Sequence, residues 1–397
     1  MINILKKEDC VGCNACVQRC PKHCILMEED EQGFLYPKVD LEKCIECHLC
    51  EKVCPVINQS EPCKPLHTYA ARNKDSEIQR SSSSGGVFFA LVNYVIKEKR
   101  GVVFGARFND KWEVVHDYAE TLEDAKVFKG SKYVQSRIGD NFKFVEDFLE
   151  SGRTVLFSGT PCQITGLKLF LRKDYKDQLI LVDVACHGVP SPMIWRNYLI
   201  YVSPNNNCSV ENILDVSFRD KKNGWENYGI RIGYNKDSSI DYLFEPMLNN
   251  LYMQGFLKDL YLRPSCYSCP AKCGKSHSDI TLADFWGITT SYPEYFAEGY
   301  YSLLLANSVR GHEVICALPD VTTREADYAV ALSSNPAIEH SARIPKQYYA
   351  FWQRFAVEGI PAIASTVDLL RPNQVQRAYY LLRRITGKAL RIVGLKR

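Results

Sequence analysis

The sequence predicts an α+β or α/β protein, in which a small domain like the bacterial ferredoxins is fused to a larger mixed α/β domain. Three observations lead to this prediction. One cysteine motif occurs twice within the first 60 residues, 34 residues apart. Between residues 154 and 200, short apolar runs alternate with helical patterns, which is typical of parallel strands joined by helices. The length of 397 residues and the charged fraction of 24% suit a globular chain of two or three domains.

The repeated motif is C-x2-C-x2-C-x3-C-P, the spacing of bacterial ferredoxins. In such proteins the fourth cysteine of each motif binds the other cluster. We therefore assign one 4Fe-4S cluster to Cys10, Cys13, Cys16 and Cys54, and a second to Cys44, Cys47, Cys50 and Cys20. Paired zinc sites are the alternative, but they would not explain the two x3-C-P endings. A module of this kind carries single electrons, so the rest of the chain should contain their destination.

The next segment predicts a strand at 69–73, a small-residue loop SSSSGG at 81–86, a helix from 87 to about 100 and a hairpin over 101–118. Small residues before a helix can present backbone N–H groups to an anion, although a flexible serine-rich loop would look the same. Residues 61–68 contain two prolines and predict a linker. We expect four segments: 1–60, the ferredoxin-type domain; 61–145 and 146–330, the two parts of the larger domain; and 331–397, a helical basic tail.

Two cysteines follow the ends of two predicted parallel strands. Strand 154–158 is followed by Cys162 and a helix to about 173, and strand 179–185 by Cys186 and a helix from about 192. Ligands bind at this edge of open α/β sheets, so the two thiols can face one site. Both can also be inert buried residues.

A third cysteine group, SCYSCPAKC, contains Cys266, Cys269 and Cys273 but no fourth ligand. Together with Cys162 and Cys186 it offers five candidates, of which we expect four to hold a third 4Fe-4S cluster. Cys266 and Cys269 are the firmest pair, and Cys273 is the reserve. Zinc at the same residues is the competing prediction. Cys208 and Cys316 are expected to be structural.

Six ordered motifs, SSGG (83–86), GSKYVQS (130–136), GTPCQ (159–163), VACHGVPSP (184–192), FRDKKNGW (218–225) and SDITLADFWG (278–287), resemble the beta subunit of coenzyme F420 hydrogenase/dehydrogenase. The resemblance covers residues 1 to about 330 when the ferredoxin domain is included. It implies that the mixed α/β domain binds FAD, that Cys162, Cys186, Cys266 and Cys269 hold the nearby cluster, and that the following residues contact the flavin: Ser83, Ser84, Gly85, Gly86, Gly130, Ser131, Lys132 and Tyr133. It leaves the roles of Asp279, Asp284 and Trp286 open.

Clusters move one electron and hydride donors move two, so a flavin would join the two kinds of chemistry. We therefore expect an iron–sulfur flavoprotein oxidoreductase that exchanges electrons with reduced ferredoxin or a similar donor. His187 is the candidate for proton transfer, ahead of His116. The substrate would be a small organic molecule, the deazaflavin coenzyme or a lipid-linked sugar, since ferredoxin-fused relatives often accompany polysaccharide genes. An electron-transfer subunit for a separate enzyme, and a protein with structural or sensory clusters, are the alternatives.

The chain begins without an apolar signal segment and has no membrane-spanning run, and 17 cysteines suit metal binding in a reducing cytoplasm. The net charge is +3, but eight basic residues lie from Arg371 onward, so the body is mildly acidic and does not suggest nucleic-acid binding. In this tail Tyr380, Leu381, Ile385, Ala389 and Ile392 recur at helical spacing. Such a helix can lie on the inner face of the membrane, or dock on the body.

Overall fold

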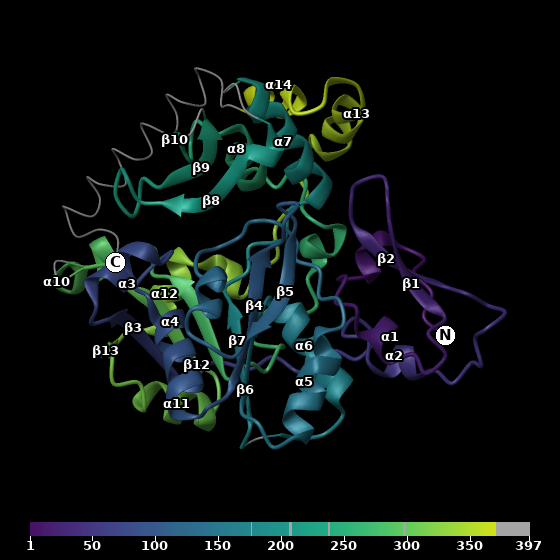
Figure 1. Cartoon of the computed structure of the whole chain (residues 1–397), viewed down its shortest axis with the longest axis horizontal. Coiled ribbons are helices and arrows are strands. Elements are labelled where there is room, and N and C mark those ends of the chain that lie inside the picture. The colour runs from purple at the N-terminus through teal and green to yellow at the C-terminus, as the bar shows by residue number, and fades with distance from the viewer. Residues whose placement is uncertain (176, 206–208, 237–238, 297–298, 371–397) are drawn as a thin grey trace, which may run out of the picture.

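One mixed sheet of eight strands forms the centre of the protein, which the computed structural model describes over residues 1–175, 177–205, 209–236, 239–296 and 299–370 (Figure 1). The strand order is β13-β3-β12-β11-β7-β6-β4-β5. Four inner strands run parallel: β4 (Val102–Phe108), β6 (Val155–Gly159), β7 (Leu179–Val184) and β11 (Ile280–Asp284). The outer strands are antiparallel to their neighbours: β3 (His67–Asn73), β5 (Val114–Ala119), β12 (Ser302–Ala306) and β13 (Val321–Glu325). The predicted hairpin and the predicted parallel pair are confirmed.

Helices cover both faces of this sheet because successive strand residues point to opposite sides. Leu156 and Ile180 pack beneath α4 (Val87–Asn93) and α11 (Val309–Cys316). Phe157 and Leu181 belong to the opposite apolar layer, with α5 and α6. The helix expected from residue 87 continues past α4 as a π-helical turn, η2. The helical segments of this part, besides α4 and α11, are α3 (Ser76–Ser81), η2 (Tyr94–Glu98), η3 (Asp124–Phe128), α5 (Asn141–Glu150), α6 (Pro161–Leu171), η5 (Pro264–Ser268), α9 (Ile288–Ser291), α10 (Pro293–Phe296), α12 (Tyr328–Ser334) and η6 (Pro336–Ile338).

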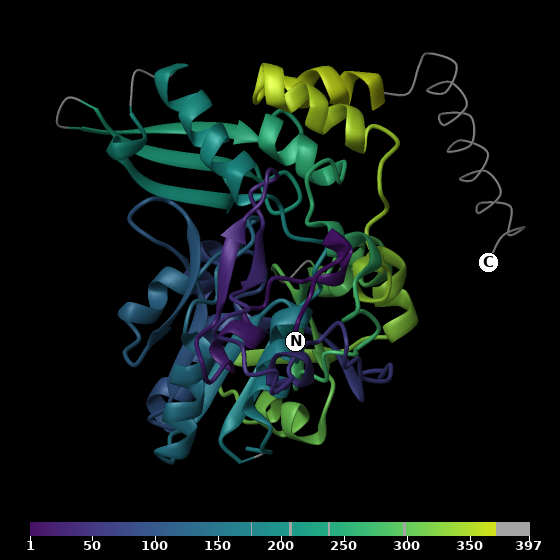
Figure 2. The ribbon, with the colours of Figure 1, turned by 90° about the vertical axis from the view of Figure 1, so that its right-hand side faces the viewer.

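A second, three-stranded antiparallel sheet of order β10-β9-β8 lies beyond one edge of the large sheet, at the top of Figures 1 and 2. Its apolar core contains Trp195, Phe218 and Tyr252, all almost completely buried. The elements of this part are α7 (Pro192–Asn205), η4 (Val210–Asn212), β8 (Ile213–Asp220), β9 (Gly229–Lys236), β10 (Ser239–Pro246), α8 (Leu251–Leu257), α13 (Tyr348–Glu358) and α14 (Pro361–Leu370).

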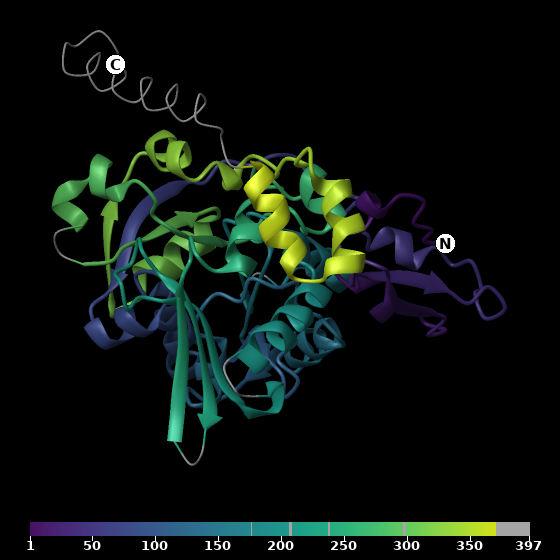
Figure 3. The ribbon, with the colours of Figure 1, turned by 90° about the horizontal axis from the view of Figure 1, so that it is seen from above.

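The N-terminal cysteine-rich module lies at one end of the molecule (Figures 1 and 3). Its core is apolar and shared with the body, since Val11, Ala15 and Val53 belong to the layer formed by α5 and α6. Its elements are η1 (Lys7–Asp9), α1 (Ala15–Gln18), the antiparallel hairpin β1 (Ile25–Glu29) and β2 (Leu35–Val39), and α2 (Leu49–Lys52). The predicted fold class, a small ferredoxin-like domain fused to a mixed α/β domain, is confirmed.

Two sequence predictions concern the C-terminal end of the chain and the membrane. The amphipathic tail, residues 371–397, lies outside the described residues. Within the part that the structure describes, no helix has the length and apolar character needed to cross a bilayer.

Asp279, whose role the sequence left open, ties β7 to β11. Its carboxylate accepts hydrogen bonds from the Leu181 backbone N–H at 2.9 Å and from the Ser308 hydroxyl at 2.6 Å. We predict that D279A destabilises the fold by about 1–3 kcal/mol, because it leaves the Leu181 N–H without this acceptor. Thermal unfolding followed by circular dichroism measures the loss. D147A, which removes an exposed carboxylate from α5, should stay within about 0.5 kcal/mol of the parent, and an equal effect of both changes would contradict the assignment.

Candidate functional site

The two ferredoxin motifs fold into equivalent loops. In each motif the residue directly after the second cysteine has a left-handed backbone, with φ of 63° at Asn14 and 56° at His48, and precedes a short helix. Each loop curls around a small cavity. Cys10, Cys13, Cys16 and Cys54 line one cavity, and Cys20, Cys44, Cys47 and Cys50 line the other. The structure thus groups the eight cysteines in the two crossed sets that the sequence assigns to two clusters.

Four cysteines of the body also come together. Cys162 is the second residue of α6, Cys186 follows β7, and Cys266 and Cys269 belong to the turn around η5. Burial, followed by the nearby Cys269 thiol, raises the pKa of Cys162 to about 12. Burial is also the main reason that the pKa of Cys186 rises to about 11, and Cys269 adds to it. Burial raises the pKa of Cys266 as well, and the Cys186, Cys269 and Cys162 thiols act in the same direction. The Cys266 Sγ also accepts from the Val189 N–H at 3.4 Å, three residues after Cys186.

Cys273 has hydrogen-bond partners in other segments of the chain. Its Sγ donates to the Glu339 carbonyl oxygen at 3.2 Å, and its backbone N–H donates to the Ile338 carbonyl at 3.2 Å. Its own carbonyl accepts from the Cys63 N–H at 2.9 Å. Cys273 therefore fastens the cysteine loop to the segment after η6 and to the linker.

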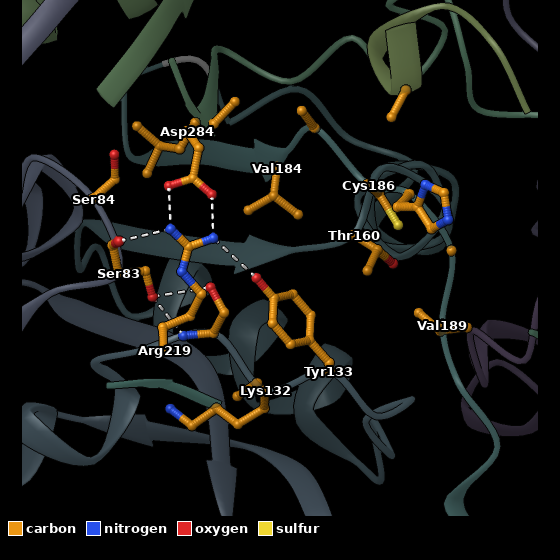
Figure 4. Close-up of a pocket in the computed structure, with 18 of the residues that line it drawn as sticks. Ser83, Ser84, Lys132, Tyr133, Thr160, Val184, Cys186, Val189, Arg219 and Asp284 are labelled. Carbon is orange, nitrogen blue, oxygen red and sulfur yellow. Dashed lines mark hydrogen bonds and ion pairs between the residues drawn. The ribbon is translucent and has the colours of Figure 1, made fainter. Parts of the chain in front are cut away.

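A pocket of about 940 Å³ lies at the carboxyl edge of the parallel strands, and Cys186 forms part of its wall (Figure 4). Of the residues that the resemblance assigns to flavin binding, the pocket wall includes Ser83, Ser84, Gly86, Gly130, Ser131, Lys132 and Tyr133. Gly85 does not reach this wall. A Cβ there would lie 2.6 Å from the Ala71 carbonyl oxygen and 2.7 Å from the Ser302 nitrogen, so Gly85 lets this loop pack against β3 and β12.

A buried ion pair holds the two predicted flavin loops together. Arg219 donates to both carboxylate oxygens of Asp284, at 2.7 and 3.2 Å, and its side chain is 2% exposed (Figure 4). It also donates to the Ser83 carbonyl at 3.2 Å and the Tyr133 hydroxyl at 3.4 Å. The Ser83 hydroxyl in turn accepts from the Ser131 N–H at 2.8 Å. Burial raises the pKa of Asp284, and Arg219 opposes that shift.

Two lysines beside the pocket donate hydrogen bonds to backbone carbonyls. The Lys132 ammonium donates to the Val127 and Lys129 carbonyls at 2.8 and 2.9 Å and so closes its own loop, and desolvation lowers its pKa to about 7. The Lys221 ammonium donates to the Gln79 and Ser84 carbonyls at 2.9 and 3.2 Å, and burial lowers its pKa to about 8. The side chain of Lys132 therefore shapes the pocket by fixing the loop whose backbone lines it.

The predicted proton-transfer residue, His187, lines the pocket next to Cys186. Its Nε2 lies 2.5 Å from the Asp259 carboxylate, a partner that sequence reasoning missed because it is 72 residues away. His116, the second candidate, is buried and donates through Nε2 to the Ser158 carbonyl at 3.0 Å. Burial lowers the pKa of His116 to about 4, so this ring is neutral near pH 7. Of the two histidines, only His187 has a carboxylate partner in the pocket.

We predict that R219M is strongly destabilising, because it leaves the buried Asp284 carboxylate unpaired, at a cost of about 3–5 kcal/mol. The double variant R219M/D284N should recover much of the loss, since it removes the stranded charge. R231M is the matched control: Arg231 pairs with Asp215 and Asp220 on the half-exposed face of β9, where such pairs contribute about 1 kcal/mol or less. Thermal unfolding midpoints compare the variants, and similar midpoints for R219M and R231M would refute the assignment.

Two family models match the chain. Residues 152–328 match the family described as the C terminus of the coenzyme F420 hydrogenase/dehydrogenase beta subunit, and residues 9–58 match the 4Fe-4S dicluster domain. Two relatives from Methanocaldococcus jannaschii, an uncharacterised ferredoxin and an uncharacterised polyferredoxin-like protein, are 38% identical over 52 residues and 32% identical over 69 residues. These alignments cover 13% and 15% of this chain and 66% and 41% of the relatives, less than two thirds of either.

Among solved structures, a chain of the xenon-derivatised F420-reducing [NiFe] hydrogenase complex from Methanosarcina barkeri aligns with 77% of this chain and 92% of its own length, at 16% identity and a TM-score of 0.45. The chain therefore combines a segment similar to the C terminus of the coenzyme F420 hydrogenase/dehydrogenase beta subunit with a preceding segment similar to a 4Fe-4S dicluster domain.

Proposed function

We propose that this chain is an iron–sulfur flavin-dependent oxidoreductase, with two 4Fe-4S clusters in the N-terminal module, a third held by Cys162, Cys186, Cys266 and Cys269, and FAD in the pocket. The observation that carries the proposal is that Cys13 of the module contacts α6, the helix that carries Cys162, and that Cys186 lies in the pocket wall. Each of the three cysteine groups offers four thiols, which is the ligand set of a 4Fe-4S cluster.

The first contact joins the module to α6. A Cβ on Gly166 would lie 2.9 Å from Cβ and 3.0 Å from Sγ of Cys13, so Cys13 rests directly on the helix backbone. Gly166 lies four residues after Cys162, on the same side of α6 and about one turn away. The set of Cys10, Cys13, Cys16 and Cys54 therefore faces the body group. The other set contains Cys47, which is exposed, and so offers its site to a donor such as reduced ferredoxin.

The pocket suits a flavin dinucleotide in size and charge. Its 940 Å³ is in the upper range of ligand pockets. Four basic side chains, Lys129, Lys132, Arg219 and Arg343, line it against two carboxylates, Asp259 and Asp284, which favours an anionic ligand such as a diphosphate. Bound there, the flavin would exchange single electrons with iron–sulfur clusters and electron pairs with an organic substrate.

Other residues of the pocket would position the flavin-binding loops and transfer protons. Arg219 and Asp284 hold the loops at 83–84 and 131–133 in place. Asp259 accepts from the His187 ring and fixes its orientation, so that the other ring nitrogen can give or take a proton at the substrate. His187 is adjacent to Cys186, so proton exchange would occur beside the cysteine group in the pocket wall.

The substrate would carry a negative charge near the part of the pocket lined by His340 and Arg343, both exposed side chains of the segment after η6. The deazaflavin coenzyme and a phosphate-bearing sugar intermediate of polysaccharide synthesis both fit this description. The large number of cysteines favours a reducing compartment such as the cytoplasm.

The second candidate is an electron-transfer subunit whose substrate is converted on a separate enzyme. It would use the same clusters and flavin, and it is favoured by the exposure of Cys47 at the outer end of the module. In this case the flavin would be reduced by an electron donor, but substrate turnover would start only after the partner enzyme is added.

We predict about 12 iron atoms and one FAD per chain in protein purified without oxygen. C162S and C266S should each reduce the iron content to about 8 atoms, because each removes a ligand of the third cluster only. C273S and C316S are the matched controls and should keep the full iron content, since neither thiol lies in the group of four. Iron and flavin analysis measure these values. A full iron content in C162S and C266S, or zinc in place of the third cluster, would reject the proposal.

We predict that G166V slows reduction of the flavin by reduced ferredoxin several-fold, because the added side chain pushes the Cys13 loop away from α6. L169V introduces the same side chain into α6 at a position where it replaces a larger one and adds no bulk, and it is the control. Stopped-flow absorbance of the flavin gives both rates. If G166V retains its iron and is reduced as fast as L169V, electrons do not cross at this contact.

A further inference from the structure

Arg263 lies between the cysteine-rich module and the body. It stands just before η5 in the loop that carries Cys266 and is completely buried. Its Nε donates to the Cys10 carbonyl at 2.7 Å, and its terminal nitrogens donate to the Leu35 carbonyl at 2.9 Å and the Gln135 side-chain oxygen at 3.0 Å. One guanidinium thus binds two backbone segments of the module and one residue of the body.

All three acceptors of this cation are neutral. Arg263 forms no ion pair with any carboxylate of the described residues, and its other close neighbours include the faces of Tyr36 and Phe34, 4.4 and 5.5 Å from the guanidinium. A buried charge is costly unless a charge of opposite sign lies nearby. Arg219, the other deeply buried arginine described above, has its own carboxylate in Asp284.

The groups on either side of Arg263 are the two cysteine sets. On the module side, Gly12 stands between Cys10 and Cys13 in the sequence, and a Cβ on Gly12 would lie 2.8 Å from a terminal nitrogen of Arg263. On the body side, the Arg263 carbonyl accepts from the Cys266 N–H at 2.8 Å. A 4Fe-4S core held by four thiolates carries a net negative charge.

We propose that Arg263 is the shared counter-ion of two clusters, the one at Cys10, Cys13, Cys16 and Cys54 and the one at Cys162, Cys186, Cys266 and Cys269. This inference rests on the proposed function, since it needs both clusters. The fixed positive charge stabilises the reduced, more negative form of each cluster and so raises both reduction potentials. Arg263 is a positioning residue, because it acts on electron transfer through the clusters and touches no substrate.

The test compares R263K with R263Q. Both variants lose the three-way hydrogen bonding of the guanidinium, but only lysine keeps a positive charge. R19M is the matched control for the module–body contact: Arg19 of the module reaches the body at Glu146, at 2.9 Å, so its charge already has a carboxylate partner. The measurement is a redox titration of the iron-loaded full chain, followed by electron paramagnetic resonance, with iron content recorded for each variant.

We expect the reduction equilibrium of both clusters to be at least tenfold less favourable in R263Q than in R263K, which corresponds to about 59 mV for one electron. R19M should keep the parental potentials. Equal potentials in R263Q and R263K at full iron content would overturn the proposal. So would loss of one cluster in both variants, because Arg263 would then act as a brace and not through its charge. If the parent chain itself fails to hold about 12 iron atoms, the proposed function fails instead.

Discussion

The parallel register of β6 and β7 is the constraint on which the candidate site depends. Gly159 pairs with Asp183, so the two strands end at the same height. Cys162 and Cys186 each follow three residues later, and both thiols therefore leave the sheet at one edge. β11 extends the same parallel arrangement on the other side of β7, with Leu282 opposite Val184, and brings Asp284 to this edge. A slip of one residue would turn the neighbouring side chains to the opposite face.

A charged side chain that is buried near this edge is stable only if polar or charged groups compensate its charge. The buried arginines meet this requirement in two different ways. Within the pocket, Arg219 has Asp284, so the protein supplies both members of this buried pair. Arg263 differs, because its acceptors are carbonyl and amide oxygens. The two arginines therefore differ in how their charge is balanced. Asp284 neutralises the charge of Arg219, whereas no carboxylate of the described residues neutralises the charge of Arg263. The guanidinium of Arg263 instead donates to the Cys10 carbonyl, and the Arg263 carbonyl accepts from the Cys266 N–H.

The sequence predicted the parts of the site that depend on local patterns, and it missed the parts that depend on long-range pairing. The repeated motif and the alternation of strands and helices could be predicted, because ligand spacing and hydrophobic periodicity are patterns within short stretches of sequence. Asp259, Arg219 and Arg263 were not assigned, since their partners lie 72, 65 and 253 residues away. Of these three residues, only Arg219 lies in a motif that the sequence analysis singled out, FRDKKNGW. The sequence already ranked Cys273 last among the five candidates, but its hydrogen bonds to Ile338 and Cys63 could not be predicted, since these partners are distant in the sequence.

Glycines set the distance between the module and the body. Side chains on Gly12, Gly33 or Gly166 would collide with Arg263, Met193 or Cys13, at 2.8, 2.3 and 2.9 Å respectively. At each of these three points of the interface, the backbone of one part is therefore in direct contact with a side chain of the other part. The connecting segment is also held, because the Cys63 and Leu66 N–H groups donate to carbonyls of the body. An interface packed in this way fixes the spacing between two cysteine groups, whereas a domain on a loose tether would not. Such fixed spacing is what electron exchange between two buried centres requires.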